Sequence, residues 1–237
     1  MIEIKNLTKK YGNKTVVDNL SIRIDAGDIF AFVGHNGAGK TTCIKAMTDL
    51  IEFDSGDILY DNISIKDNPL EVKKKIAYIP DSPEVYDFLK GIDYLNFIAD
   101  VYNLDEKRID KINKYATDFE LKEFLANPIS SYSHGMKQKL IIISALIRSP
   151  KYLILDEPFV GLDPVATKKL KDYMKELTKD GTSIFFSTHI LEVAEKFCNK
   201  VAIIKHGKLI VTGEMNKVLK DKSLEDIFLE LQNENAS

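Results

Sequence analysis

A glycine-rich run followed by one lysine and two threonines has the residue types and spacing that bind a phosphate group. Residues 34–42 read GHNGAGKTT and fit the pattern G-x-x-x-x-G-K-[ST]. Glycines let successive backbone N–H groups turn inward around an anion, and the start of a following helix adds a partial positive charge. At this spacing Lys40 would reach the β and γ phosphates of a nucleotide, and Thr41 would offer its hydroxyl to Mg²⁺. The pattern therefore predicts a nucleoside triphosphate site.

The same run also has a purely structural interpretation, a glycine-rich turn between a strand and a helix with an exposed lysine. The flanking residues favour the phosphate site, because an apolar run precedes the loop and a helix is predicted after it. His35 stands at a free position of the pattern, where a loop histidine without a catalytic role is the simpler interpretation. The residues assigned to this part of the nucleotide site are Gly34, His35, Asn36, Gly37, Ala38, Gly39, Lys40, Thr41 and Thr42.

Two adjacent acids, Asp156 and Glu157, follow a second apolar run, YLIL at 152–155. The carboxyl end of a strand is where α/β sheets bind ligands, and a buried core gives no reason to place two acids there. Because neighbouring side chains of a strand point in opposite directions, the two acids can have different roles. We predict that Asp156 holds Mg²⁺ and that Glu157 activates the attacking water as a general base. The alternative is that Glu157 and Pro158 only begin a solvated loop.

Apolar runs predict the strands that position these residues. Leu20, Ile22 and Ile24 alternate with polar residues, as in a half-buried strand, whereas every residue from 29 to 33 is apolar, as in a strand covered on both faces. Further patterns predict a helix at 40–47, strands at 152–155 and 184–186, a helix from 164 to 177 and a hairpin at 201–211. The residues from 223 on predict a short helix whose polar end frays.

The residues from 83 to 147 change to helical periodicity. One predicted helical face is shared by Ile92, Leu95, Ile98 and Val101, and another by Ile109, Ile112, Ala116 and Phe119. We therefore predict an ATPase-type core made of residues 1–82 and 148–237, with residues 83–147 inserted as a small helical subdomain.

The composition is that of an ordinary globular protein and argues against several classes. The chain has 237 residues, 44% of them hydrophobic and 29% charged, and its net charge of −3 does not suggest a nucleic-acid partner. The longest apolar stretch, 140–147, is far shorter than the roughly 18 residues that span a bilayer, and no secretory signal is visible. Cys43 and Cys198 lack metal-ligand or disulfide spacing and are interpreted as small buried hydrophobes. We expect a cytoplasmic chain.

A phosphate loop and an acidic strand end occur in many classes of nucleotide hydrolase, and the stretch SYSHGMKQK at 131–139 indicates which class this is. Its residues YSHGM resemble LSGGQ, the signature motif of the ABC-type ATPases, although three of the five positions differ. Alone, such a segment is equally the start of a helix. The order of parts is also similar to the family's: phosphate loop, helical insertion, signature, acidic strand, GLD at 161–163, then a histidine after a strand. The chain therefore resembles an ABC nucleotide-binding domain over almost its whole length.

The resemblance implies an α/β fold: a P-loop NTPase core with a mixed sheet, an N-terminal antiparallel β part and an inserted α-helical subdomain. Lys40, Glu157 and His189 would be catalytic, with His189 contacting the γ-phosphate and ordering the attacking water. Tyr11 would stack on adenine, and Asp163 would lie in a loop that reaches across a dimer. The structural alternatives are an edge-strand tyrosine, a helix N-cap at Asp163 and an unremarkable strand-end histidine.

Asp81 departs from the family's pattern. After a strand reading IAYIP the family usually has a glutamine that senses Mg²⁺ and the attacking water and relays the nucleotide state to a membrane partner. An aspartate is shorter and charged. We expect Asp81 to approach the metal with an altered reach, so that the predicted metal ligands are Thr41, Asp156 and Asp81.

In the family, Ser133 and Gly135 would contact the γ-phosphate of a nucleotide held by the other subunit. The resemblance thus implies a homodimer, or pairing with a related ATP-binding subunit, that encloses two ATP molecules with Mg²⁺. Binding of ATP would shift the population towards the closed dimer, and hydrolysis would release it.

The resemblance also implies integral membrane permease subunits as partners, on the inner face of the cell membrane, with transport as the function. The YSHGMKQ wording is similar to exporter-type bacterial components. The aromatic residues Tyr86, Phe88, Tyr94 and Phe97 are a candidate docking surface, although such residues at helical spacing are more often core. The alternative function is a soluble ABC ATPase in cluster assembly or another non-transport process, and Glu157 argues against a third, a nucleotide sensor without hydrolysis.

Overall fold

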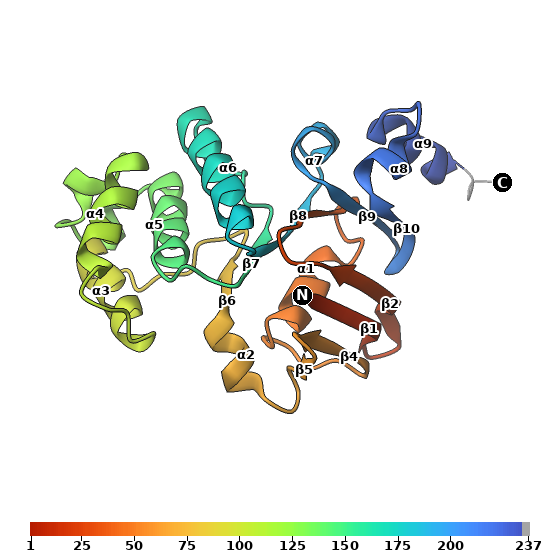
Figure 1. Cartoon of the computed structure of the whole chain (residues 1–237), viewed down its shortest axis with the longest axis horizontal. Helices are drawn as coiled ribbons and strands as arrows, with labels where there is room; N and C mark the ends of the chain where they lie inside the picture. Colours follow the sequence, from red (N-terminus) through yellow and green to blue (C-terminus); the bar gives the residue numbers. More distant parts are fainter. Residues whose placement is uncertain (234–237) are drawn as a thin grey trace.

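A computed structural model describes residues 1–233, and the polar end at 234–237, for which fraying is predicted, lies outside the described residues. Figure 1 shows the β-sheets and most of the helices packed together, with a separate group of helices at one end. That group consists of α3 (Gly91–Val101), α4 (Arg108–Asp118) and α5 (His134–Leu146).

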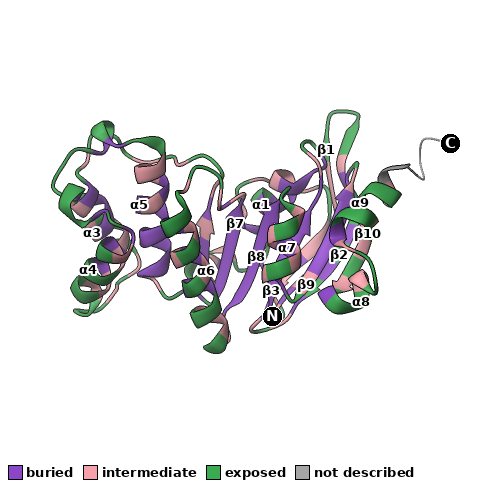
Figure 2. Ribbon diagram, turned by 90° about the horizontal axis from the view of Figure 1, so that it is seen from above, coloured by how far each residue is buried: buried purple, intermediate pink, exposed green. Residues whose placement is uncertain are grey.

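The main sheet has six strands, of which all but one edge strand run parallel to one another. The central strands are buried along their whole length, as their apolar sequences predict (Figure 2). In spatial order the strands are β10 (Lys208–Glu214), β9 (Lys200–Lys205), β3 (Ile29–Val33), β8 (Ser183–Thr188), β7 (Tyr152–Asp156) and β6 (Ile76–Ile79).

Parallel strands bring the ends of several distant segments to one edge of this sheet. The phosphate loop follows β3, Glu157 follows β7, His189 follows β8 and Asp81 lies two residues beyond β6. Because β3, β8, β7 and β6 are consecutive neighbours, these four groups lie side by side. The strand order therefore brings together the predicted site residues, although they are far apart in the sequence.

A second, antiparallel sheet covers the first helix of the core. It contains β2 (Lys14–Ile24), β1 (Ile2–Tyr11), β4 (Ser55–Tyr60) and β5 (Ile63–Ser64) in that order. The alternation predicted for residues 20–24 is confirmed, since Leu20, Ile22 and Ile24 are buried and the intervening residues are exposed. Helix α1 (Lys40–Met47) supplies Cys43, Ile44 and Met47 to a core shared with both sheets. This position fixes the helix that begins at the phosphate loop.

The opposite face of the main sheet packs against the helices other than α1 and α2 (Pro69–Lys75). Odd-numbered positions of β3 point to this side and even-numbered positions to α1, as the alternation of a strand requires. Helix α2 lies outside this layer, beside the edge strand β6. The remaining helices are α2 (Pro69–Lys75), α6 (Pro164–Lys179), α7 (Leu191–Phe197), α8 (Met215–Leu219) and α9 (Leu224–Asn233), with short 3₁₀ turns at Lys122–Phe124 and Ile129–Ser131.

The helical segment differs from the predicted faces at two positions. Leu95 and Ile112 are buried, but Val101 is 55% exposed and Ile109 is 61% exposed. Val101 is the last residue of α3 and Ile109 the second of α4, so both side chains lie at helix ends, where they are more than half exposed. One apolar core runs from these helices to the sheet, and the division at 83 and 147 stays a prediction.

Candidate active site

The phosphate loop needs glycine at two places for steric reasons. A Cβ atom at Gly34 would lie 2.6 Å from the carbonyl oxygen of Ile204, and one at Gly39 would lie 2.6 Å from that of Val16. Gly39 also has a φ of 108°, a conformation that side chains disfavour. The loop can therefore wrap closely only because these residues lack side chains, and its N–H groups precede an eight-residue helix.

Lys40 is folded into this loop rather than extended into solvent. Its Nζ donates to the carbonyl oxygens of Gly34 at 2.7 Å and of His35 at 3.3 Å. The same ammonium lies 3.5 Å from Oε1 of Glu157, and only 7% of the Lys40 side chain is exposed. This buried ammonium is in contact with oxygen atoms, and a phosphate oxygen can bind it in the same way.

Asp156 is fully buried, and one of its two oxygens is unpaired. Ser187 donates to Oδ1, whereas Oδ2 has no hydrogen-bond partner among residues 1–233. Burial raises the pKa of Asp156, and the nearby hydroxyl groups of Ser187 and Thr41 oppose the rise. A buried carboxylate with a free oxygen beside a threonine hydroxyl fits a divalent cation such as Mg²⁺, because hard cations prefer oxygen ligands.

Glu157 and His189 form a contact across neighbouring strands. Oε2 of Glu157 lies 3.0 Å from Nδ1 of the His189 ring and accepts from the backbone N–H of His189 at 3.4 Å. Oε1 of the same carboxylate faces Lys40. The three side chains predicted to be catalytic therefore form one connected chain of polar contacts.

A cleft of about 220 Å³ lies beside Lys40 and Glu157. It is also lined by Asp81 and by two further residues of the phosphate loop, Thr41 and Thr42. The structure thus brings Asp81 to the cleft, although its Oδ1 accepts from the backbone N–H of Ser82. The remaining lining residues are Val16, Asn36, Gly37 and Gly39.

Other predicted residues lie away from this cleft in the single chain. Tyr11 is 52% exposed at the end of β1, with the Lys9 ammonium 4.9 Å from its ring centre. Ser133 caps α5 by accepting from the N–H of Met136 at 3.3 Å. Neither Ser133 nor Gly135 lines the cleft. Their nucleotide roles, like that of Tyr11, stay predictions.

Asp163 performs the capping role expected from sequence. Its Oδ1 accepts from the N–H of Ala166 at 2.8 Å at the start of α6. Its Oδ2 lies 2.7 Å from Nζ of Lys139 on α5, and this hydrogen bond, followed by the one from Ala166, lowers the pKa of Asp163. An ion pair therefore connects α5, which begins within the signature segment, to the loop before α6.

Ser187 is the functional residue that sequence reasoning missed. Its hydroxyl donates to Asp156 and accepts from the backbone N–H of Glu157 at 3.0 Å, so it holds both acids. A polar residue at the end of the apolar strand β8 was the available signal, but its pairing opposite Asp156 requires the sheet register.

The histidines and cysteines mostly behave as predicted. His35 is a loop residue whose Nδ1 lies 2.8 Å from the carbonyl oxygen of Asn36, and its ring contacts that of His206. His134 is the first residue of α5, directly after the N-cap residue Ser133. Cys43 and Cys198 are free and buried, as predicted.

The fold and this cleft define the class of the protein as a nucleotide-binding α/β ATPase. Residues 17–160 match the family model described as "ABC transporter". The lantibiotic transport ATP-binding protein SrtF of Streptococcus pyogenes is 34% identical over 96% of each chain. The solved structure of an ATP-binding subunit of an ABC transporter is 32% identical, with a TM-score of 0.94, and the match covers 98% of this chain and 100% of the other.

A dimeric cassette, MJ0796 in a post-hydrolysis state with ADP and Pi, has the same fold, with a TM-score of 0.82 at 23% identity over 91% of this chain and 99% of that one. The chain belongs to the ABC transporter family, as an ATP-binding and ATP-hydrolysing subunit. No helix within residues 1–233 combines the length and hydrophobicity that crossing a bilayer requires.

Proposed function

We propose that two ATP-binding subunits close around two ATP molecules and drive transport through separate membrane subunits. The observation that carries this proposal is the separation of the two halves of the site. The phosphate cleft contains Lys40 and Glu157, whereas Ser133 and Gly135 are not among the residues that line it. A second chain would supply the missing half, as the family's arrangement implies. The relatives named for transport support this function, and the dimeric cassette supports the association.

Within each site we assign roles by position. Lys40 binds the terminal phosphates once they displace Glu157 from its ammonium, and Thr41 with Asp156 would hold Mg²⁺. When bound, the ion neutralises phosphate charge. Glu157 accepts a proton from the attacking water, and His189 orients that carboxylate through the 3.0 Å contact.

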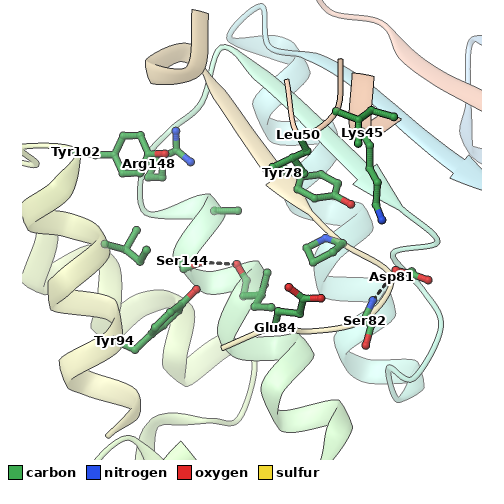
Figure 3. A pocket seen from close by; sticks show the side chains of 15 residues that line it. Lys45, Leu50, Tyr78, Asp81, Ser82, Glu84, Tyr94, Tyr102, Ser144 and Arg148 are labelled. Carbon is green, nitrogen blue, oxygen red and sulfur yellow. Dashed lines mark hydrogen bonds between the residues drawn. The ribbon is translucent and has the colours of Figure 1, made fainter. Parts of the chain in front are cut away.

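The membrane partner would bind a groove of about 490 Å³ between the core and the helical segment (Figure 3). Figure 3 shows side chains from α3, α5 and the segment after β6 that converge on this groove. Cationic groups, Lys45 and Arg148, and acidic groups, Asp81 and Glu84, line different parts of it. Asp81 belongs to both the groove and the nucleotide cleft, so it connects partner binding with nucleotide state.

Exposed aromatic side chains beside the groove support the docking proposal. Phe88 is 82% exposed, Tyr86 51% and Phe97 45%, so the expectation that such residues are core is wrong for these three. Tyr94 is buried, in agreement with that expectation. Exposed aromatic clusters on a soluble surface mark interaction sites. We propose the inner face of the cell membrane as the location and export as the direction, the latter from the wording of the signature.

Size-exclusion chromatography of Glu157→Gln tests the composite site. With ATP this variant should elute as a dimer, and without ATP as a monomer. Adding Ser133→Glu to the same chain should abolish the dimer but leave ATP affinity intact, because Ser133 would contact only the partner's nucleotide. A loss of ATP affinity in the monomer would refute the assignment.

Recovery from cell membranes tests the partner. A transport subunit should sediment with membranes and, after detergent extraction, purify with an integral protein. Phe88→Glu should weaken that association while the ATPase activity of the isolated chain is retained. A chain that remains soluble with no integral partner would favour the alternative, a soluble ABC ATPase.

A further inference from the structure

Three phenylalanine rings connect the segment that carries Glu157 to the segment that carries His189. Phe159 lies two residues after Glu157, Phe186 three residues before His189, and Phe197 ends the helix that follows His189. The Phe159 ring meets the Phe186 ring edge-on at 5.6 Å between centres and the Phe197 ring at 6.4 Å. The Phe186 and Phe197 rings are also 6.4 Å apart. Every pair of the three rings is therefore in contact.

The backbone at Glu157 needs such anchoring. Its φ of 46° lies in the left-handed region, which non-glycine residues rarely adopt. The next residue is Pro158, whose ring restricts the residue before it to extended conformations. A residue held in a disfavoured conformation persists only when its surroundings determine it, and such residues cluster at active sites.

The backbone is held both at Glu157 itself and at the two residues that follow it. At its own backbone N–H, Glu157 donates to the hydroxyl of Ser187, which also binds Asp156 on the preceding strand end. On the downstream side, Pro158 is buried and Phe159 packs on its two partner rings. The ring contact is thus the side-chain anchor that follows the disfavoured residue.

Helix α6 contributes a cation, the ammonium of Lys171, that packs on the ring cluster. Nζ of Lys171 lies 5.1 Å from the centre of the Phe159 ring and 5.7 Å from that of Phe197. An ammonium within about 6 Å of a ring centre is attracted by the ring face. Phe159 therefore contacts residues of β8, α7 and α6, and all three elements contribute to the apolar core.

We propose that the Phe159 ring is a positioning group for ATP hydrolysis, which holds the Glu157 carboxylate against His189 and in line with the cleft. The proposal rests on the roles proposed above for Glu157 and His189. Phe159 is not among the residues that line the nucleotide cleft. It acts by fixing the segment after β7 to the segment after β8, through its contacts with the Phe186 and Phe197 rings.

Steady-state kinetics of Phe159→Leu test the proposal. Because small misplacements of a reacting group reduce rates strongly, we expect kcat to fall by about tenfold or more. The KM for ATP should change less than about twofold, since the phosphate loop is untouched and binding and chemistry separate in the two constants. Phe159→Tyr keeps the ring and should retain kcat. Phe197→Leu removes a partner ring instead and should reproduce the fall, which keeps the test valid if Phe159→Leu does not fold.

The Glu157→Gln background separates positioning from a general structural effect. In single-turnover measurements Phe159→Leu should have no further effect there, because the group that it positions is gone. Phe119→Leu is the matched control: its ring packs on Tyr173, away from the cleft, and should leave kcat unchanged.

Unchanged kcat in folded Phe159→Leu would overturn the proposal. So would an equal fall in Phe119→Leu or a further fall in the Glu157→Gln background. If Glu157→Gln alone retained turnover, the proposed base would be wrong instead, so the two failures are distinguishable.

Discussion

Replacing Glu157 by glutamine should have opposite effects on ATP turnover and ATP affinity. The substitution keeps the size of the side chain but removes the charge that faces Lys40 at 3.5 Å. Loss of a general base lowers the rate by about 10²- to 10⁴-fold, equivalent to roughly 3–5 kcal/mol of barrier. Turnover should therefore fall by that amount.

The affinity change follows from the Lys40–Glu157 distance. Two unit charges 3.5 Å apart attract by about 5 kcal/mol at an effective dielectric constant near 20 and about 1 kcal/mol at 80. In the nucleotide-free chain this attraction competes with the incoming phosphate for Lys40. Even the smaller value corresponds to about fivefold tighter binding once the charge is removed.

Isothermal titration with MgATP measures this affinity, and phosphate release measures turnover. Glu192→Gln is the matched control, because Glu192 is an exposed acid paired with Lys196 outside the cleft. It should change neither quantity. Weaker ATP binding by Glu157→Gln would refute the competition between carboxylate and phosphate, and retained turnover would refute the base.

Three further predictions concern the cap, the buried acid and the loop. Asp163→Asn keeps the cap but loses the charge that faces Lys139, whereas Asp163→Ala loses both. In a denaturant titration Asp163→Ala should therefore lose about 1 kcal/mol more unfolding free energy than Asp163→Asn, and equal values would contradict the capping role. Burial raises the pKa of Asp156, so the folded chain takes up a proton at a higher pH than the unfolded chain, and the stability contributed at this site falls as pH rises through that range. Asp156→Asn should accordingly raise the melting temperature without Mg²⁺ at neutral pH, where an unchanged or lower value would contradict the argument, and should abolish the Mg²⁺ dependence of ATP binding. Gly39→Ala should weaken ATP binding by at least about tenfold in the same titration, because its Cβ would meet the Val16 carbonyl oxygen, and wild-type affinity would show that the loop tolerates the change.

Local sequence determined the phosphate loop, the acidic strand end and most elements of the core. These features depend on short-range chemistry: glycines that admit close backbone approach, apolar runs that form covered strands, and an aspartate before a proline that caps a helix. For that reason the predicted helix at 40–47 and the buried strand at 29–33 are confirmed with their predicted bounds.

Exposure in the helical segment depended on packing that periodicity cannot reveal. Val101 and Ile109 continue apolar faces but lie at helix ends, where they are more than half exposed, and Phe88 is solvent-exposed although its type suggests core. Hydrophobic spacing predicts which side of a helix is apolar, but the length of the neighbouring element decides how far burial extends.

Only the tertiary structure decided which residues meet. Ser187 binds both acids because β7 and β8 are neighbours in a register that pairs it with Asp156, and Phe159 reaches two rings from other elements. The sequence by itself determined that a phosphate site and a pair of acids exist. Their arrangement depended on strand order and register, which arise from the summed burial of many side chains and are written in no single motif.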